Sequence, residues 1–147
     1  MAVNRVEQIH QLRAAALRAV ERRAWKKALV CYQSLERLET TEGDWPRKAG
    51  EMCRKLHLVD QATVELTRAR DLYTRDGNWL KAIAICRLIL AIDPQDNRTQ
   101  RKLNVLLFCQ KSQMSSMTSR ADARAFVTPP DRVDMASSDG GEWSANA

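Results

Sequence analysis

The sequence is poor in the residues that β-sheets and tight turns need. Only 5% of its 147 residues are aromatic, and it contains 5 glycines and 4 prolines. Strands favour aromatic and β-branched side chains, while hairpin turns favour glycine and proline. The composition is therefore typical of an all-α protein, and the length suits one domain.

The four cysteines are widely spaced, and no C-x-x-C pair occurs. Structural zinc sites usually begin from such a pair, so we expect neither a metal nor another cofactor. Each cysteine lies among apolar residues of a helical pattern, where a free thiol acts as a small hydrophobic group. Unpaired cysteines are typical of a reducing compartment, which predicts a cytoplasmic protein.

Long apolar runs are also missing. None approaches the about 18 residues that a membrane-spanning helix needs, and the stretch MAVNRVEQIHQL lacks the layout of a signal peptide. We therefore expect no insertion into a membrane.

The charge is unevenly distributed along the chain. The net charge is +6; residues 1–111 hold 21 Lys+Arg against 13 Asp+Glu, and residues 112–147 hold 3 against 5. A basic body favours an anionic partner, which can be an acidic protein face, nucleic acid or phospholipid headgroups. Surface Lys and Arg that only keep the protein soluble would give the same counts.

Apolar residues recur at helical intervals in six segments. The segments are residues 4–22, 25–39, 44–56, 60–76, 79–92 and 93–111. The fifth is apolar almost all round, with only Lys81 and Arg87 charged, so it is either sandwiched inside the fold or faces a partner. Asp44 is expected as the N-cap of the third helix, and Asp93-Pro94 as the N-cap and first residue of the sixth.

The helical pattern ends near Ser112. We predict a helical domain over residues 1–111 and a flexible, mildly acidic tail over 112–147, with a short helix near residues 120–126. Within the tail, Phe126, Val127 and Trp143 are either anchors of a short linear motif or part of an inert terminus.

An internal repeat links three of these segments. Ala28, Ala62 and Ala82 fall at matching points, and the first two are 34 residues apart. Two antiparallel helices approach closely only where one carries a small residue, and a period of 34 is typical of a helix–turn–helix array. Trp25 and Trp79 precede two of these alanines, where a bulky side chain wedges the hairpin.

These residues resemble the tetratricopeptide-repeat (TPR) family. The matching residues are Tyr73, Gly77, Ala82 and Asp93-Pro94, preceded by Ala49, Gly50, Ala62 and Ala69. The resemblance covers roughly residues 9–111 and implies an all-α, TPR-like solenoid of about six antiparallel helices. The repeat-defining residues are Ala28, Gly50, Ala62, Ala69, Gly77, Ala82 and Pro94.

Two turns depart from the family pattern. Where Gly77 occupies its turn, the other repeats carry Arg23 and His57, and a left-handed backbone is uncommon for residues other than glycine. If Arg23 stayed helical, the first two helices would fuse into one rod. We predict the hairpin.

The resemblance implies a groove that holds a peptide or helix of another protein. The faces left free by packing would expose His10, Arg13, Arg47, Glu51, Arg54, Lys55 and Lys81. Such a mostly cationic groove favours an acidic peptide or a C-terminal carboxylate, because Arg makes paired hydrogen bonds to carboxylates. The plain alternative is a solvated helix face. The predicted function is thus a non-catalytic adaptor, scaffold or chaperone-like module.

Other functions are weighed against this one. Nucleic-acid binding is the runner-up, because residues 22–27 read RRAWKK, although Trp25 is already explained as a wedge. An enzyme is disfavoured, because His10 and His57 belong to no recognisable catalytic arrangement and no phosphate loop occurs. Self-association through helix 79–92 or the C-terminal end of the solenoid, and an acidic tail lying across the chain's own groove, are further hypotheses.

Overall fold

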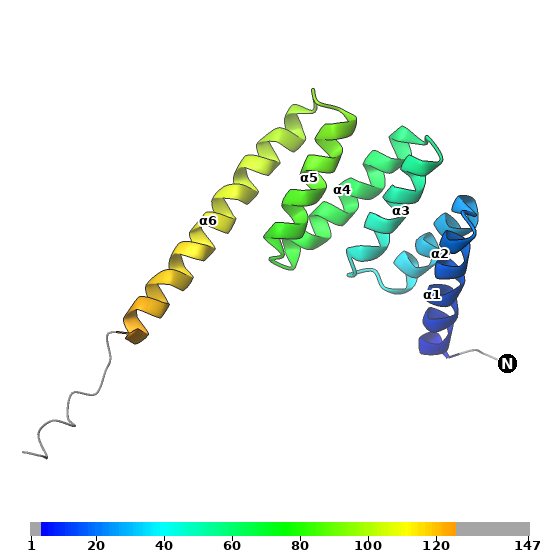
Figure 1. Cartoon of the computed structure of the whole chain (residues 1–147), viewed down its shortest axis with the longest axis horizontal. Helices are drawn as coiled ribbons and strands as arrows, with labels where there is room; N and C mark the ends of the chain where they lie inside the picture. Colours follow the sequence, from blue (N-terminus) through cyan, green and yellow to red (C-terminus); the bar gives the residue numbers. More distant parts are fainter. Residues whose placement is uncertain (1–3, 126–147) are drawn as a thin grey trace, which may run out of the picture. The chain divides into compact units, whose positions relative to one another are not determined.

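The structure is a computed structural model that describes residues 4–125. The helices are α1 (Arg5–Glu21), α2 (Trp25–Leu38), α3 (Asp44–Lys55), α4 (Val59–Arg75), α5 (Trp79–Ile92) and α6 (Asn97–Ala125) (Figure 1). No strand occurs in this described part, so the all-α prediction and its six helices are confirmed. The chain divides into two units, residues 1–110 and 111–147.

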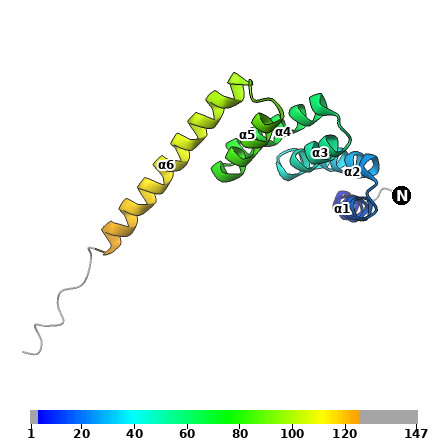
Figure 2. The ribbon, with the colours of Figure 1, turned by 45° about the horizontal axis from the view of Figure 1, so that its top comes forward.

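The first five helices pack in chain order. α1 packs on α2, α2 on α3, α3 on α4 and α4 on α5, which Figure 2 shows from a second direction. One group of buried side chains joins α1, α2 and α3, and includes Leu35 and Cys53. A second group joins α4, α5 and α6 through Leu66, Ile89 and Leu106. Because Ala62 belongs to the first group and Leu66 to the second, α4 connects them.

Small residues lie where the helices approach most closely, as predicted. Ala28, Ala62, Ala69 and Ala82 are all 0% exposed. Gly50 is also buried, and a Cβ added there would lie 2.9 Å from Cγ and Cδ2 of Leu66 on α4. The seam between α3 and α4 therefore depends on the absence of a side chain on α3.

The turns between α1 and α2, between α3 and α4 and between α4 and α5 share one backbone geometry. Arg23, His57 and Gly77 have φ values of 56°, 60° and 74°. In each turn the next residue donates its N–H to a carbonyl five residues back, as in Leu58 to Cys53 at 2.8 Å. This is the pattern that closes a helix with a left-handed residue. The predicted hairpin at Arg23 is confirmed, and α1 and α2 do not fuse.

The turn geometry gives a test by substitution. Gly77→Ala should lower the free energy of unfolding by about 1–2 kcal/mol, the cost of a left-handed residue with a Cβ. Nothing lies within 4 Å of the added Cβ, so backbone strain is the main cost. His57→Gly should raise it by up to about 1 kcal/mol. Urea denaturation measures the free energy of unfolding of both variants. If both substitutions raised it, or both lowered it, the shared left-handed geometry would be contradicted.

The start of α6 differs from the prediction. Pro94 lies in the turn after α5, and the helix begins only at Asn97. Asp96, not Asp93, accepts from the N–H groups of Arg98 and Thr99 at 3.0 and 3.1 Å. The predicted N-cap at Asp93 was therefore wrong by three residues. Asp96 is the same residue type, and it is the one that accepts from the free N–H groups of the first turn.

α5 lies within the protein's own core. Its residues Ala82, Ile83, Ile85, Cys86 and Ile89 are at most 4% exposed. Of the two predicted alternatives for this segment, burial inside the fold is observed for these five side chains. Leu80, Ala84 and Ala91 are exposed, Leu80 with 69% of its surface.

α6 is longer than the sequence pattern indicated. It continues to Ala125, whereas the prediction placed a flexible tail from Ser112. No proline or glycine occurs between residues 97 and 125, so nothing in this segment stops a helix. Residues 111–121 are all exposed, so the apolar periodicity gave no signal there. The proposed anchors Phe126, Val127 and Trp143 lie outside the described residues.

Two carboxylates share one arginine between α2 and α4. The Arg68 guanidinium lies 2.6 Å from Glu36 and 3.5 Å from Glu65, which is only 7% exposed. Burial raises the pKa of Glu65 above 4.5, and the charge of Glu36 raises it further, while Arg68 opposes the shift. The folded protein therefore binds this proton more tightly than the unfolded chain does.

A pH dependence follows from the raised pKa. The protonated Glu65 carboxyl stabilises the fold fully at a pH below 4.5, the pKa of this group in the unfolded chain. This stabilisation is lost as the pH rises through the higher pKa that Glu65 has in the folded protein. Compared with Glu65→Gln, the wild type should lose free energy of unfolding as the pH rises from 4.5 to neutrality. Urea titrations of both proteins across this range measure the difference. A constant difference would contradict the raised pKa.

Candidate functional site

The predicted binding residues centre on α3. Arg47, Glu51 and Arg54 follow one another at intervals of four and three residues, which places them on one side of the helix. Arg47 lies 2.6 Å from Glu51, and its side chain is 32% exposed. Arg54 and Lys55, in the last turn, are exposed and belong to no ion pair within the described residues. Arg47, Glu51 and Arg54 therefore share one face of α3, and their part in binding stays a prediction.

Arg13 reaches the start of α3 from α1. Its guanidinium lies 5.0 Å from the centre of the Trp45 ring and 3.0 Å from Glu39. The indole N–H of Trp45 donates to the same carboxylate at 2.7 Å. Trp45 also stacks on Tyr32 of α2, with ring centres 6.3 Å apart. Its contacts with Glu39 and Trp45 therefore direct the Arg13 guanidinium toward the start of α3.

Lys81 reaches the same turn of α3 from α5. Its ammonium group lies 3.3 Å from Asp44 and 5.2 Å from the centre of the Tyr73 ring. The Tyr73 hydroxyl also donates to Asp44. Burial alone would raise the pKa of Asp44, but the hydrogen bonds from Tyr73 and Lys81 outweigh it, and the pKa is lowered. Asp44 is therefore a stable anion that links α3, α4 and α5.

These contacts define the α3 surface. It comprises Arg13, Glu39, Asp44, Arg47, Lys48, Glu51, Arg54, Lys55 and Lys81. Arg13 contacts Trp45, and Arg47 and Lys81 both approach Asp44, so all three reach the first turn of α3. Lys55 lies at the other end, 4.4 Å above the Trp25 ring. His10 is exposed on α1 three residues before Arg13, and its side chain makes no hydrogen bond or ion pair within residues 4–121.

The charge of the α3 surface is more mixed than the sequence suggested. The α3 surface contains six cations and three carboxylates, and the carboxylates form ion pairs with Arg13, Arg47 and Lys81. The predicted binding residues did not include Glu39, Asp44 or Lys48. Asp44 had been assigned as an N-cap, whereas Gly43 holds that position and frees the carboxylate for Tyr73 and Lys81.

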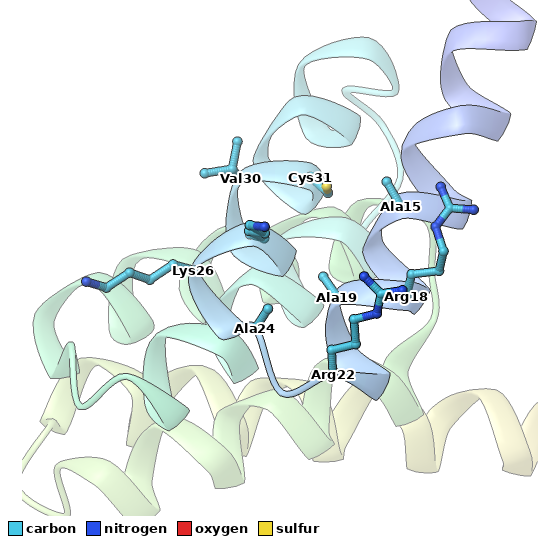
Figure 3. Close-up of a pocket in the computed structure, with 9 residues that line it drawn as sticks. Ala15, Arg18, Ala19, Arg22, Ala24, Lys26, Val30 and Cys31 are labelled. Carbon is cyan, nitrogen blue, oxygen red and sulfur yellow. The ribbon is translucent and has the colours of Figure 1, made fainter.

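A separate cavity of about 510 Å³ lies between α1 and α2 (Figure 3). Arg18 and Arg22 of α1 and Lys26 and Lys27 of α2 line it together with apolar residues. The apolar residues are Ala15, Ala19, Ala24, Val30 and Cys31. The sequence signal for this site was the RRAWKK stretch, but its Trp25 packs against the core instead of lining the cavity.

The described residues offer no metal site. No group of three or more His, Cys, Asp or Glu side chains comes together there. His10 and His57 are both exposed and lie on different helices or turns. None of the described helices is both long and apolar enough to cross a membrane.

Comparisons with known proteins find a likeness among solved structures. No protein-family model matches the chain, and a search of curated proteins finds no match either. Among solved structures, the chain is similar to the Arabidopsis OM64 TPR domain, with 16% sequence identity and a TM-score of 0.43. The match covers 70% of this chain and 97% of that domain.

Proposed function

We propose that this protein is a non-catalytic interaction module that holds an acidic peptide or helix of a partner protein on its α3 surface. The observation that supports this function is the convergence of side chains from α1, α3 and α5 with six cations and three carboxylates. Ring contacts and ion pairs fix several of these cations before a partner arrives. Fixed groups lose less side-chain entropy on binding, which favours affinity.

The unpaired cations would supply the net attraction. Arg13, Arg47 and Lys81 already have carboxylate partners, so an incoming carboxylate has to replace one of these. Lys48, Arg54 and Lys55 have no carboxylate partner among the described residues. We therefore expect Arg54 and Lys55 to contribute more to the association rate than Arg13, and binding to weaken as salt rises.

The test is a quantitative affinity purification from nuclease-treated native lysate. The bait is the full chain, compared with Arg47→Glu/Arg54→Glu/Lys55→Glu. We expect one protein to be retained by the wild type and reduced about ten-fold or more by the variant, because three attractive charges become repulsive. Circular dichroism and thermal melting verify that the variant is folded.

A matched control changes the same amount of charge elsewhere. Arg37, Arg75 and Arg87 are exposed and belong to no ion pair in the described part of the chain. Arg37→Glu/Arg75→Glu/Arg87→Glu should retain the partner. Equal loss with both triple variants would show that only net charge matters, and recovery of nucleic acid alone without nuclease would favour the runner-up function.

A further inference from the structure

The cavity between α1 and α2 has a charged rim without a counter-charge. Its lining contains four cations and no carboxylate. None of the ion pairs within residues 4–121 involves Arg18, Arg22, Lys26 or Lys27. Arg18 and Arg22 are four residues apart along the chain, a spacing at which like charges on a helix repel each other. The C-terminal end of α1 and the N-terminal end of α2 meet here, so their dipoles oppose each other and the positive potential comes from the four side chains.

The floor of the cavity is apolar and made of small side chains. Ala15, Ala19 and Ala24 leave room between the helices, and Cys31 lines the opposite wall (Figure 3). Val30 is 61% exposed at the edge. A volume of about 510 Å³ falls in the range of pockets that bury a ligand's side chains or rings. The cavity thus suits bulky apolar groups carried beside negative charges.

The lining disfavours nucleic acid as the occupant. Single-stranded nucleic acids bind by stacking bases on aromatic side chains along a basic groove. No aromatic side chain lines this cavity. Trp25, the aromatic of the RRAWKK stretch, packs against the core, and Lys55 covers its ring at 4.4 Å.

We propose that this cavity binds an acidic amphipathic helix of a partner protein. Leu, Ile, Phe or Met side chains on its apolar face would enter between α1 and α2, and its Asp and Glu side chains would pair with the four cations. Two neighbouring helices leave a groove along which a third helix packs, and amphipathic helices are a common ligand of such grooves. The charge complementarity selects an acidic helix.

This site is distinct from the α3 surface. Arg18 follows Arg13 by five residues, which turns it by roughly 140° around α1. The cavity and the α3 surface share no residue. A partner can therefore occupy one without the other, and a peptide titration of the cavity does not depend on the proposed function of the α3 surface.

The test uses the full ¹⁵N-labelled chain and a model peptide. The probe is an acetylated, amidated Leu/Ala/Glu amphipathic helix of about 18 residues, roughly five turns. A control peptide replaces every Glu by Lys. We expect the acidic peptide to produce saturable shifts in the backbone amides of Ala19, Ala24 and Cys31, and the basic peptide to produce none.

Three variants locate the binding. Arg18→Glu/Lys27→Glu should weaken the acidic peptide about ten-fold or more. Arg75→Glu/Arg87→Glu, with the same charge change at exposed positions outside both sites, should keep the affinity within about two-fold. Ala15→Phe retains all four cations but fills the cavity, and should also weaken binding about ten-fold. Thermal melting of each variant verifies folding.

Several results would overturn the proposal. One is the absence of saturable shifts up to about 1 mM peptide. Another is a set of shifts confined to Arg47 through Lys55, which would assign the peptide to the α3 surface. A third is an oligouridylate that shifts the cavity amides while the acidic peptide does not, because that result would identify a nucleic-acid site.

Discussion

Leu66→Ala should lower the free energy of unfolding by about 2–5 kcal/mol, the range for buried leucines. Leu66 is 0% exposed and occupies the space left by the missing side chain of Gly50. Truncation removes its contacts and leaves a cavity between α3 and α4. Because small domains have only about 5–15 kcal/mol of stability, the loss should be plain in urea denaturation.

A control and a rescue make this expectation specific. Val64 lies on the same helix with 57% of its surface exposed, and Val64→Ala should change the stability by no more than about 0.5 kcal/mol. Gly50→Ala adds a methyl that would collide with Leu66 in the wild type but fits the cavity in Leu66→Ala. The two substitutions should therefore couple favourably by about 0.5–3 kcal/mol. Strict additivity would contradict the observed contact between these residues.

Ala62→Leu should lower the free energy of unfolding by about 1–3 kcal/mol because it overfills the same seam. Ala62 is 0% exposed, and its carbonyl oxygen lies 3.4 Å from a Cβ built on Gly50. A leucine has no room there unless α3 and α4 move apart. Thermal and urea unfolding of the purified variant give the measurement.

An exposed alanine provides the matched control. Ala84 lies on α5 and is exposed, so Ala84→Leu should be nearly neutral. Leucine and alanine differ little in helix propensity, so the comparison isolates packing. If Ala62→Leu melted like the wild type, the helix register along the α3–α4 seam would be incorrect.

The repeat could be predicted because its signals are local. Ala28, Ala62 and Ala82 recur beside matching turns, and close helix packing requires small residues at such points. The left-handed turns at Arg23 and His57 could be inferred from Gly77 by alignment alone. Each copy of the signal is a short pattern of a turn followed by an alanine five residues later, and aligning copies that lie 20 or 34 residues apart makes it visible in the sequence.

The candidate sites were less accessible to sequence reasoning. Glu39 is 26 residues from Arg13, and Asp44 is 37 residues from Lys81, so only the packing of the helices brings them together. The carboxylates that partly neutralise the α3 surface were missed for this reason. The α1–α2 cavity arises because small side chains line it. Small side chains add no recognisable hydrophobic pattern to the sequence, so the cavity could not be predicted from it. The extension of α6 was missed because an exposed helix needs no apolar stripe.

Site-specific photocrosslinking tests partner binding at the α3 surface most directly. A benzoylphenylalanine would replace Leu17, which is 59% exposed and follows Arg13 by one turn, or Arg54 at the other end of the α3 surface. A third variant would carry benzoylphenylalanine at Val64, an exposed position on α4. We predict that one protein is crosslinked from both Leu17 and Arg54 and not from Val64. Crosslinking of that protein from Val64 alone would contradict binding at the α3 surface.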